Sequence, residues 1–365
     1  MRTEEKFKNN LVNFLQQEEE RRGRKFFSLK KILFLFFIGF FIIGFTFSYQ
    51  AFSSGGKVFG KKHSFFSQVK KLVFSENKEE IQKQKQINIL LLGMRGTDHQ
   101  KDQGGGNYLS DTNILLSIRP EEKKAAMLSI PRDLFATIDG FGKNRINASY
   151  ALNLEKYKDG DKAAEKTIED FEKILGVDIQ YYVKIDFVGF EKTIDILGGV
   201  DINIEKSFTD SEYPDLNYGY QTISFEKGLE HMDGDRALKF VRSRHGNGGE
   251  GSDFARAKRQ QQILSATKDK ALSFSTLLNP IKINRLIASV GDHVRTDMEL
   301  NQAMELFNLC KDISSDQIIN QVIDNSNNGL LYSTRTEQGA YVLIPNKGED
   351  DFSEIQELAR NIFEK

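Results

Sequence analysis

Scarce cysteine and a near-zero net charge each exclude a class of protein. The single cysteine, Cys310, cannot form an intramolecular disulfide, so the fold must rely on its hydrophobic core even if the domain lies outside the cytosol. The formal net charge of -1 excludes a chain that binds nucleic acid as a general polycation through phosphate contacts alone. We therefore expect no nucleic-acid partner, and any anion site must be a local cluster of basic side chains.

Familiar catalytic signatures are also absent from the sequence. There is no HExxH zinc motif, no Walker A phosphate loop and no CxxC pair, and the five histidines do not cluster at metal-ligand spacings. No internal repeat is evident, and no Pro- or Ser-rich linker divides the C-terminal part. With 365 residues, of which 39% are hydrophobic and 28% charged, the chain is long enough to bury one large core.

Residues 32–52 form the longest apolar run and contain no charged side chain. A helix that spans a bilayer needs roughly 20 mostly apolar residues, so this segment is predicted to be a transmembrane helix. Basic residues favour the cytoplasmic side, and six lie just upstream: Arg21, Arg22, Arg24, Lys25, Lys30 and Lys31. A cleaved signal peptide is the alternative, but its apolar core is usually about 7–15 residues. We expect a single-pass protein of the cell membrane with a cytoplasmic N-terminus and an extracytoplasmic C-terminal part.

The remaining segments are assigned by composition and periodicity. Residues 1–31 are charged and predict a cytoplasmic tail, and residues 53–85 are rich in Ser, Gly and Lys and predict a stalk. From residue 86 to 365, short apolar runs alternate with helical patterns, which predicts one α/β domain with a mixed central sheet flanked by helices. The expected strands are 87–93, 112–118, 125–130, 179–185 and 198–204, and the expected helices are 161–175, 187–197, 277–289, 300–311 and 352–363.

Arginines follow two of the expected core elements. Arg132 comes directly after the strand that Pro131 ends, and the carboxyl ends of strands line the ligand crevice in open α/β sheets. A surface pair with Asp133 is the alternative. Arg242 and Arg244 follow a short helix, and their guanidinium groups converge only if the chain is extended at that point. Two guanidinium forks suit phosphate oxygens better than lysine charges do.

Two further segments suggest an anion or metal site. Asp253 or the residue before it begins a helix on which Arg256 and Gln260 share one face by i,i+4 spacing. An ordinary cap on an exposed charged helix is the alternative. Asp111 enters a buried strand from a glycine-rich loop, and one or two carboxylates usually hold Mg²⁺ beside phosphate oxygens. Asn147 is predicted to cap the helix that follows it.

Seven short motifs occur in a fixed order behind the apolar segment. They are NILLLG at 88–93, SDT at 110–112, SIPRD at 129–133, INASY at 146–150, DILGGVDI at 195–202, ALKFVRSRH at 237–245 and DFARAKRQQ at 253–261. In this combination the sequence resembles the LytR-CpsA-Psr family, closely over residues 86–270 and loosely beyond. The resemblance implies an α/β domain with a long hydrophobic pocket for a polyprenyl chain and a mouth where arginines and Mg²⁺ hold a diphosphate.

The resemblance also implies an activity and partners. Members of the family are regarded as phosphotransferases that move a glycopolymer from a polyprenyl diphosphate carrier to peptidoglycan. The expected partners are therefore the lipid-linked glycan donor, the peptidoglycan acceptor and membrane lipid. A polyprenyl diphosphate hydrolase is one alternative, because water could replace the sugar hydroxyl at the same site. A non-enzymatic membrane-bound regulator of envelope genes is another, but the 31-residue tail is short for a nucleic-acid-binding module.

Site residues follow from the motifs that this sequence shares with the family. The diphosphate contacts implied are Arg132, Arg242, Arg244, Arg256 and Gln260. Asp111, Asp253 and Arg244 are the implied catalytic residues, with Asp111 also a magnesium ligand. The family usually has an aspartate two residues after the glycine of its first motif, whereas here that position is Arg95 and the next aspartate is Asp98. Either Asp98 is the second magnesium ligand, or the metal has fewer protein ligands in this chain.

Overall fold

A computed structural model describes residues 84–96, 106–215, 219–273 and 291–364. The expected tail, the expected transmembrane helix and nearly all of the expected stalk lie outside these ranges, as does the helix expected at 277–289. Within the described ranges no helix combines the length and apolar character that a membrane crossing needs. All described residues belong to one compact unit, which comprises residues 53–365.

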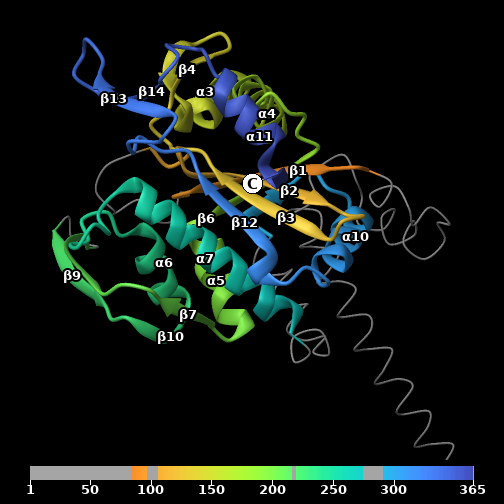
Figure 1. The fold of residues 1–365 in the computed structure, drawn as a ribbon, viewed down its shortest axis with the longest axis vertical. Helices are drawn as coiled ribbons and strands as arrows, with labels where there is room; N and C mark the ends of the chain where they lie inside the picture. The colour runs from red at the N-terminus through yellow and green to blue at the C-terminus, as the bar shows by residue number, and fades with distance from the viewer. Residues whose placement is uncertain (1–83, 97–105, 216–218, 274–290, 365) are drawn as a thin grey trace, which may run out of the picture. The chain divides into compact units, whose positions relative to one another are not determined.

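A six-stranded mixed sheet forms the centre of this unit (Figure 1). Its strand order is β11-β6-β1-β2-β3-β12. The pairs β1/β6 and β3/β12 are parallel and the other three are antiparallel. The strands are β1 (Ile87–Met94), β2 (Ser110–Arg119), β3 (Lys124–Ser129), β6 (Tyr181–Asp186), β11 (Val294–Thr296) and β12 (Ile318–Val322). The prediction of a mixed α/β domain is confirmed.

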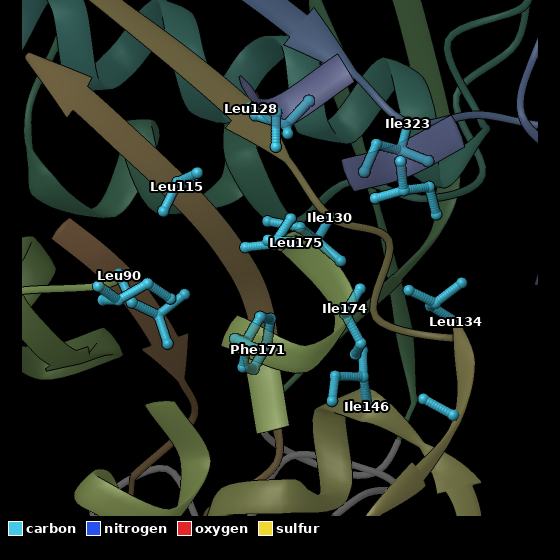
Figure 2. Close-up of a cluster of buried hydrophobic side chains, with 14 of the residues drawn as sticks. Leu90, Leu115, Leu128, Ile130, Leu134, Ile146, Phe171, Ile174, Leu175 and Ile323 are labelled. Atoms are coloured by element: carbon cyan, nitrogen blue, oxygen red, sulfur yellow. The ribbon is translucent and has the colours of Figure 1, made fainter. Parts of the chain in front are cut away.

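Strand β1 is buried on both faces, as its unbroken apolar run predicts. Leu90 and Leu92 point into one core with Phe171, while Ile87 and Ile89 point into another on the opposite face. The first core packs against α3 (Ser149–Tyr157), α4 (Gly160–Leu175) and α11 (Ser353–Arg360), which lie on one side of the sheet in Figure 1. Figure 2 shows part of this core, including Phe171, Ile174 and Leu175 of α4. The second core packs against α10 (Leu300–Cys310).

A third core lies among α5 (Phe187–Leu197), α6 (Gly234–Arg242) and α7 (Asp253–Leu272). It also includes two small antiparallel sheets, β7 (Val200–Ile204) with β10 (Gly228–Met232) and β8 (Phe208–Pro214) with β9 (Tyr220–Phe225). Phe225 lies at the centre of an aromatic cluster, with its ring centroid 5.0 Å from that of Phe208 and 5.1 Å from that of Phe240. These phenylalanines therefore fill a core.

The remaining elements border the first core. Strand β4 (Phe135–Ile138) pairs with β5 (Gly142–Arg145), and β13 (Leu331–Arg335) forms a hairpin with β14 (Tyr341–Pro345). Single 3-10 turns are η1 (Ile146–Ala148), η2 (Ser315–Gln317) and η3 (Ile362–Glu364). The helix expected at 352–363 is therefore α11 followed by the separate turn η3.

Most helix ends follow the capping chemistry of the sequence. Asp233 accepts a hydrogen bond from the backbone N–H of Arg236 and caps α6. Gly176 ends α4 in the left-handed region, at φ 62°, which glycine adopts without strain. The prediction that Asn147 caps a helix is wrong. Asn147 is buried inside η1, and the N-cap position of α3 is Ala148, which has no capping side chain.

The first core generates a stability prediction. Phe171 is fully buried in it, so Phe171→Ala should lower the free energy of unfolding by about 3–5 kcal/mol through lost burial and a cavity. Leu229→Ala is the control because that side chain is 77% exposed, and its effect should stay within about 0.5 kcal/mol. Urea unfolding of the full chain, followed by circular dichroism, measures both values. Equal midpoints for the two variants would contradict this assignment of the core.

Candidate active site

One edge of the central sheet brings the motif residues together. Because β1 is parallel to β6 and antiparallel to β2, the carboxyl end of β1 lies beside the carboxyl end of β6 and the amino end of β2. The register places Met94 opposite Asp186 and Gly93 opposite Thr112, while Ile114 of β2 lies opposite Ser129 at the end of β3. The segments that carry the motifs at 88–93, 110–112 and 129–133 therefore meet at this edge.

The end of α6 decides how Arg242 and Arg244 are displayed. The helix ends at Arg242, and Ser243 has the extended backbone angles φ -53° and ψ 133°. The chain is thus extended there, and both arginines line the same cavity. Arg259 of α7 holds this segment in place, because its guanidinium donates to the carbonyls of Ser243 and Phe240 at 2.6 and 2.9 Å.

Asp210 of β8 fixes the same segment from the other side. It is fully buried and accepts hydrogen bonds from Ser243 Oγ at 2.7 Å and from the backbone N–H groups of Arg244 and His245 at 3.0 and 3.1 Å. Burial acts to raise the pKa of Asp210, but these hydrogen bonds outweigh it and lower the pKa. The carboxylate therefore stays ionised and holds Arg244 at the cavity.

Asp253 joins three arginines that are distant in the sequence. Ser252 caps α7 by accepting from the N–H of Ala255, which places Asp253 at the first position of the helix. Asp253 Oδ1 lies 2.9 Å from Arg256 Nη1 and 3.3 Å from Arg244 Nε, and Oδ2 lies 3.5 Å from Arg132 Nε.

Two further carboxylates complete this cluster. Asp111 Oδ1 accepts from Arg132 Nη1 at 2.6 Å, while Nη2 of the buried Arg256 lies 3.3 Å from the Asp111 carbonyl oxygen. Arg132 also contacts Asp133 at 3.3 Å, but Asp133 is buried, so this is not the surface pair considered as the alternative. Three carboxylates and three guanidinium groups thus share one compact network.

Asp253 and Asp111 are both ionised across the neutral pH range. Burial acts to raise the pKa of Asp253, but Arg256, Arg244 and Arg132 outweigh it and lower the pKa to about 2. Burial also acts to raise the pKa of Asp111, but the nearby arginines, above all Arg132, outweigh it and lower the pKa. Burial lowers the pKa of Arg256 to about 10, so its guanidinium remains protonated at neutral pH.

A cavity of about 450 Å³ opens beside the cluster. Its charged and polar lining residues include Asp111, Arg132, Arg242, Arg244, Arg256 and Gln260, and its apolar and aromatic lining residues include Leu109, Phe187, Tyr213, Pro214 and Val241. Arg242 contacts two of the aromatic residues. Its guanidinium carbon is 4.5 Å from the Phe187 ring centroid, and its Nη1 is 3.3 Å from the Tyr213 hydroxyl. The volume of this cavity is typical of a small-molecule site. It does not by itself demonstrate a long lipid pocket, so the pocket implied by the resemblance stays a prediction.

The expected magnesium site is only partly described. Asp98 lies outside the described residues. Among the residues that the structure describes, no three His, Cys, Asp or Glu side chains lie close enough together to hold a metal ion. Asp111 fits a site of the kind in which the substrate supplies most ligands, because its ionised carboxylate lines the cavity and is 27% exposed. One of its oxygens already accepts from Arg132, which leaves Oδ2 for a cation.

The structure brings together every described residue that the motifs single out. Asp111, Arg132, Arg242, Arg244, Arg256 and Gln260 line the cavity, and Asp253 bonds to three of its arginines. Sequence reasoning missed Arg95, Asp210, Tyr213 and Arg259, of which the first three also line the cavity. Arg95 follows the end of β1 as Arg132 follows β3, a signal that was available. Asp210 and Tyr213 carry no such signal, because only the return of β8 to the end of α6 places them there.

Known proteins are similar to this chain in sequence and in fold. The LytR_cpsA_psr family model matches residues 49–357. The polyisoprenyl-teichoic acid–peptidoglycan teichoic acid transferase TagU of Bacillus cereus is 31% identical over 283 residues, which are 76% of this chain and 82% of that protein. The TagU of Oceanobacillus iheyensis is 32% identical over 220 residues, 60% of this chain and 61% of that protein.

Two further similarities concern a regulator and a solved structure. The protein named regulatory protein MsrR from Staphylococcus aureus is 35% identical over 214 residues, 58% of this chain and 56% of that protein. The crystal structure of Bacillus subtilis TagV superimposes with a TM-score of 0.57 at 26% identity, over 77% of this chain and 98% of that one. Because the family match covers well over half of its residues, the chain belongs to the LytR-CpsA-Psr family.

Proposed function

We propose that this protein is a phosphotransferase that moves a glycopolymer from a polyprenyl diphosphate carrier to a sugar hydroxyl of peptidoglycan. The observation that carries the proposal is the gathering of Arg132, Arg242, Arg244 and Arg256 on one cavity that also has apolar lining residues. Guanidinium groups match phosphate oxygens bidentately, and apolar side chains suit the lipid end of the same molecule. The names of the TagU relatives support this donor and acceptor.

The transfer step asks the protein mainly for positioning and for charge stabilisation. The acceptor hydroxyl oxygen forms a bond to the phosphorus that carries the glycan. The bond from that phosphorus to the bridging oxygen breaks, and its electron pair leaves with polyprenyl phosphate. The hydroxyl proton passes to solvent, and Asp253 accepts a hydrogen bond from the hydroxyl before attack. A carboxylate with so low a pKa is a weak base at neutral pH, so orientation is its main contribution.

The arginines act on the charge of the diphosphate. Arg256 is buried and Arg132 and Arg244 are partly buried, so their charges are screened less than surface charges would be. Asp253 and Asp111 hold these guanidinium groups in place before substrate arrives, which reduces reorganisation during the reaction. A magnesium ion held by Asp111 Oδ2 and diphosphate oxygens would neutralise further charge on the phosphates.

We also propose that the enzyme is held at the membrane by residues 32–52, with the described domain on the extracytoplasmic side. The charge-free run and the upstream arginines and lysines support this arrangement. It would place the cavity where lipid-linked donor and peptidoglycan meet.

A transferase, a hydrolase and a regulator should differ in how much polyprenyl phosphate they release in one assay. The full chain in detergent with Mg²⁺ and a polyprenyl diphosphate disaccharide should release polyprenyl phosphate only when soluble peptidoglycan fragments are present. The disaccharide phosphate should then be found on those fragments by mass spectrometry. Equal release without fragments would show a hydrolase, and release in neither case would contradict an enzymatic role with this class of donor.

Arg244 provides a test of the arginine cluster. Arg244→Ala should lower the transfer rate on the order of 10²-fold, because one charge-stabilising donor is lost. The control Arg360→Ala removes an exposed arginine of α11 that does not line the cavity, and its rate should stay near wild type. Wild-type transfer by the Arg244 variant would remove the arginine cluster from the mechanism.

Asp253 provides a test of the electrostatics. A folded-state pKa lowered to about 2 means that the contribution of Asp253 to stability is fully present above the ordinary pKa of about 3.9 and is lost as pH falls through the lowered value. The free energy of unfolding of Asp253→Asn should therefore decline less than that of wild type between about pH 4 and about pH 2. Glu337→Gln, in the exposed β13–β14 turn, is the control and should follow the wild-type curve. Parallel curves for wild type and Asp253→Asn would contradict the network.

A further inference from the structure

The large cavity contains a histidine and a glutamate that have no role in the proposed function. His245 directly follows Arg244, Glu212 belongs to β8, and both side chains line the cavity. Nδ1 of His245 lies 3.9 Å from Oε2 of Glu212. The two side chains are 54% and 62% exposed, so a rotation of either one can bring the pair to hydrogen-bond distance.

An irregularity in β8 gives Glu212 this position. Strand β8 pairs Asp210 with Ile223 of β9 and Tyr213 with Gln221, so β8 has one more residue than β9 between the two pairs. A regular strand would direct Glu212 to the same face as the buried Asp210. The bulge instead makes Tyr213 the next buried residue and leaves Glu212 exposed at the cavity. Bulges beside binding sites commonly redirect a side chain in this way.

One buried carboxylate holds both members of the pair. Asp210 Oδ2 accepts from the backbone N–H of His245 at 3.1 Å, and Oδ1 accepts from the backbone N–H of Glu212 at 3.0 Å. Asn247 and Thr209 join the same two segments, because the N–H of each donates to an oxygen of the other at 3.0 Å. The backbones of His245 and Glu212 are therefore fixed relative to each other.

We propose that His245 is the base that receives the proton of the acceptor hydroxyl, and that Glu212 is the positioning residue that orients its imidazole. This inference rests on the proposed function, in which Asp253 orients the hydroxyl but is a weak base at neutral pH. Histidine is the most frequent general base because it exchanges a proton near neutral pH. A carboxylate at Nδ1 keeps the ring proton on that nitrogen, which leaves the lone pair of Nε2 to accept.

The transfer step balances with this proton acceptor. A hydroxyl has one proton, so its hydrogen bond to Asp253 is exchanged for one to the imidazole as attack begins. The hydroxyl oxygen then bonds to phosphorus, the O–H bond breaks, and the proton passes to His245 Nε2 directly or through one water molecule. The electron pair of the bond from phosphorus to the bridging oxygen leaves with polyprenyl phosphate. The imidazolium finally releases its proton to solvent, which its exposure permits.

Other charged groups share the cavity with the imidazole. The pKa values of Asp210 and Asp111 are lowered and that of Arg256 is about 10, so these three groups keep their charge between about pH 5 and about pH 8. A variant of His245 is needed to separate its titration from that of the rest. The other charged or titratable groups of the lining are Glu212, Arg242, Arg244, Arg95, Arg132, Tyr213 and Tyr220.

A pH profile of the transfer assay with the full chain tests the base. The wild-type kcat should fall about 10-fold for each pH unit on the acidic side, because a protonated imidazole cannot accept a proton. His245→Gln should lower kcat on the order of 10²-fold at about pH 7.5, abolish this fall and leave the donor KM unchanged. Glu212→Gln should lower kcat by a smaller factor. Imidazole in the buffer should restore part of the rate of His245→Ala but none of that of Arg244→Ala.

His231 provides the matched control, because it pairs with Asp201 at 2.7 Å, is 56% exposed and does not line the cavity. His231→Gln should keep the wild-type kcat and pH profile. In a protein that performs transfer, equal kcat values for His245→Gln and wild type would overturn this inference alone. A lowered kcat that keeps the wild-type fall with pH would also overturn it. No transfer by the wild-type chain would instead contradict the proposed function, and this inference with it. Coincident melting curves of the variants, followed by circular dichroism, exclude unfolding as the cause of a lowered kcat.

Discussion

The arrangement of the site depends on one shared carboxylate. Asp253 bonds to Arg256 and Arg244 and lies 3.5 Å from Arg132, so one negative charge holds three positive charges in a partly buried space. Without a counter-charge, buried guanidinium groups would repel one another and would lose their hydration without compensation. Asp111 adds a second negative charge to the same group. Arg132 also contacts Asp133, which in turn pairs with Arg145, so four arginines face three aspartates in the extended network. The remaining positive charge suits a diphosphate.

The fold makes this cluster possible by ending several elements at the same place. Four strands of the mixed sheet, β1, β3, β6 and β12, end at one edge, and β2 and β11 begin there. Helix α6 ends and α7 begins beside the large cavity. The ends of strands and helices have backbone N–H and C=O groups that secondary structure leaves unpaired. Here buried side chains form hydrogen bonds with several of these groups. Asp210 and Arg259 both bind the segment after α6 in this way. Neither needs to touch substrate, yet each decides where Arg244 points.

The sequence by itself predicted the strands β1, β2, β3, β6 and β7 and the helices α4, α5 and α10, but not the strands β4, β5 and β8 to β14. Apolar runs such as 87–93, the caps at Asp233 and Ser252 and the glycine after α4 act locally, so their pattern can be read from adjacent residues. Only the tertiary structure decided which charges meet, since Asp111 and Arg256 are 145 residues apart. It also decided that the chain is extended after Arg242, that Asn147 is buried rather than a cap, and that the β13–β14 hairpin lies beside Asp133. These outcomes depend on long-range packing, which no local pattern encodes.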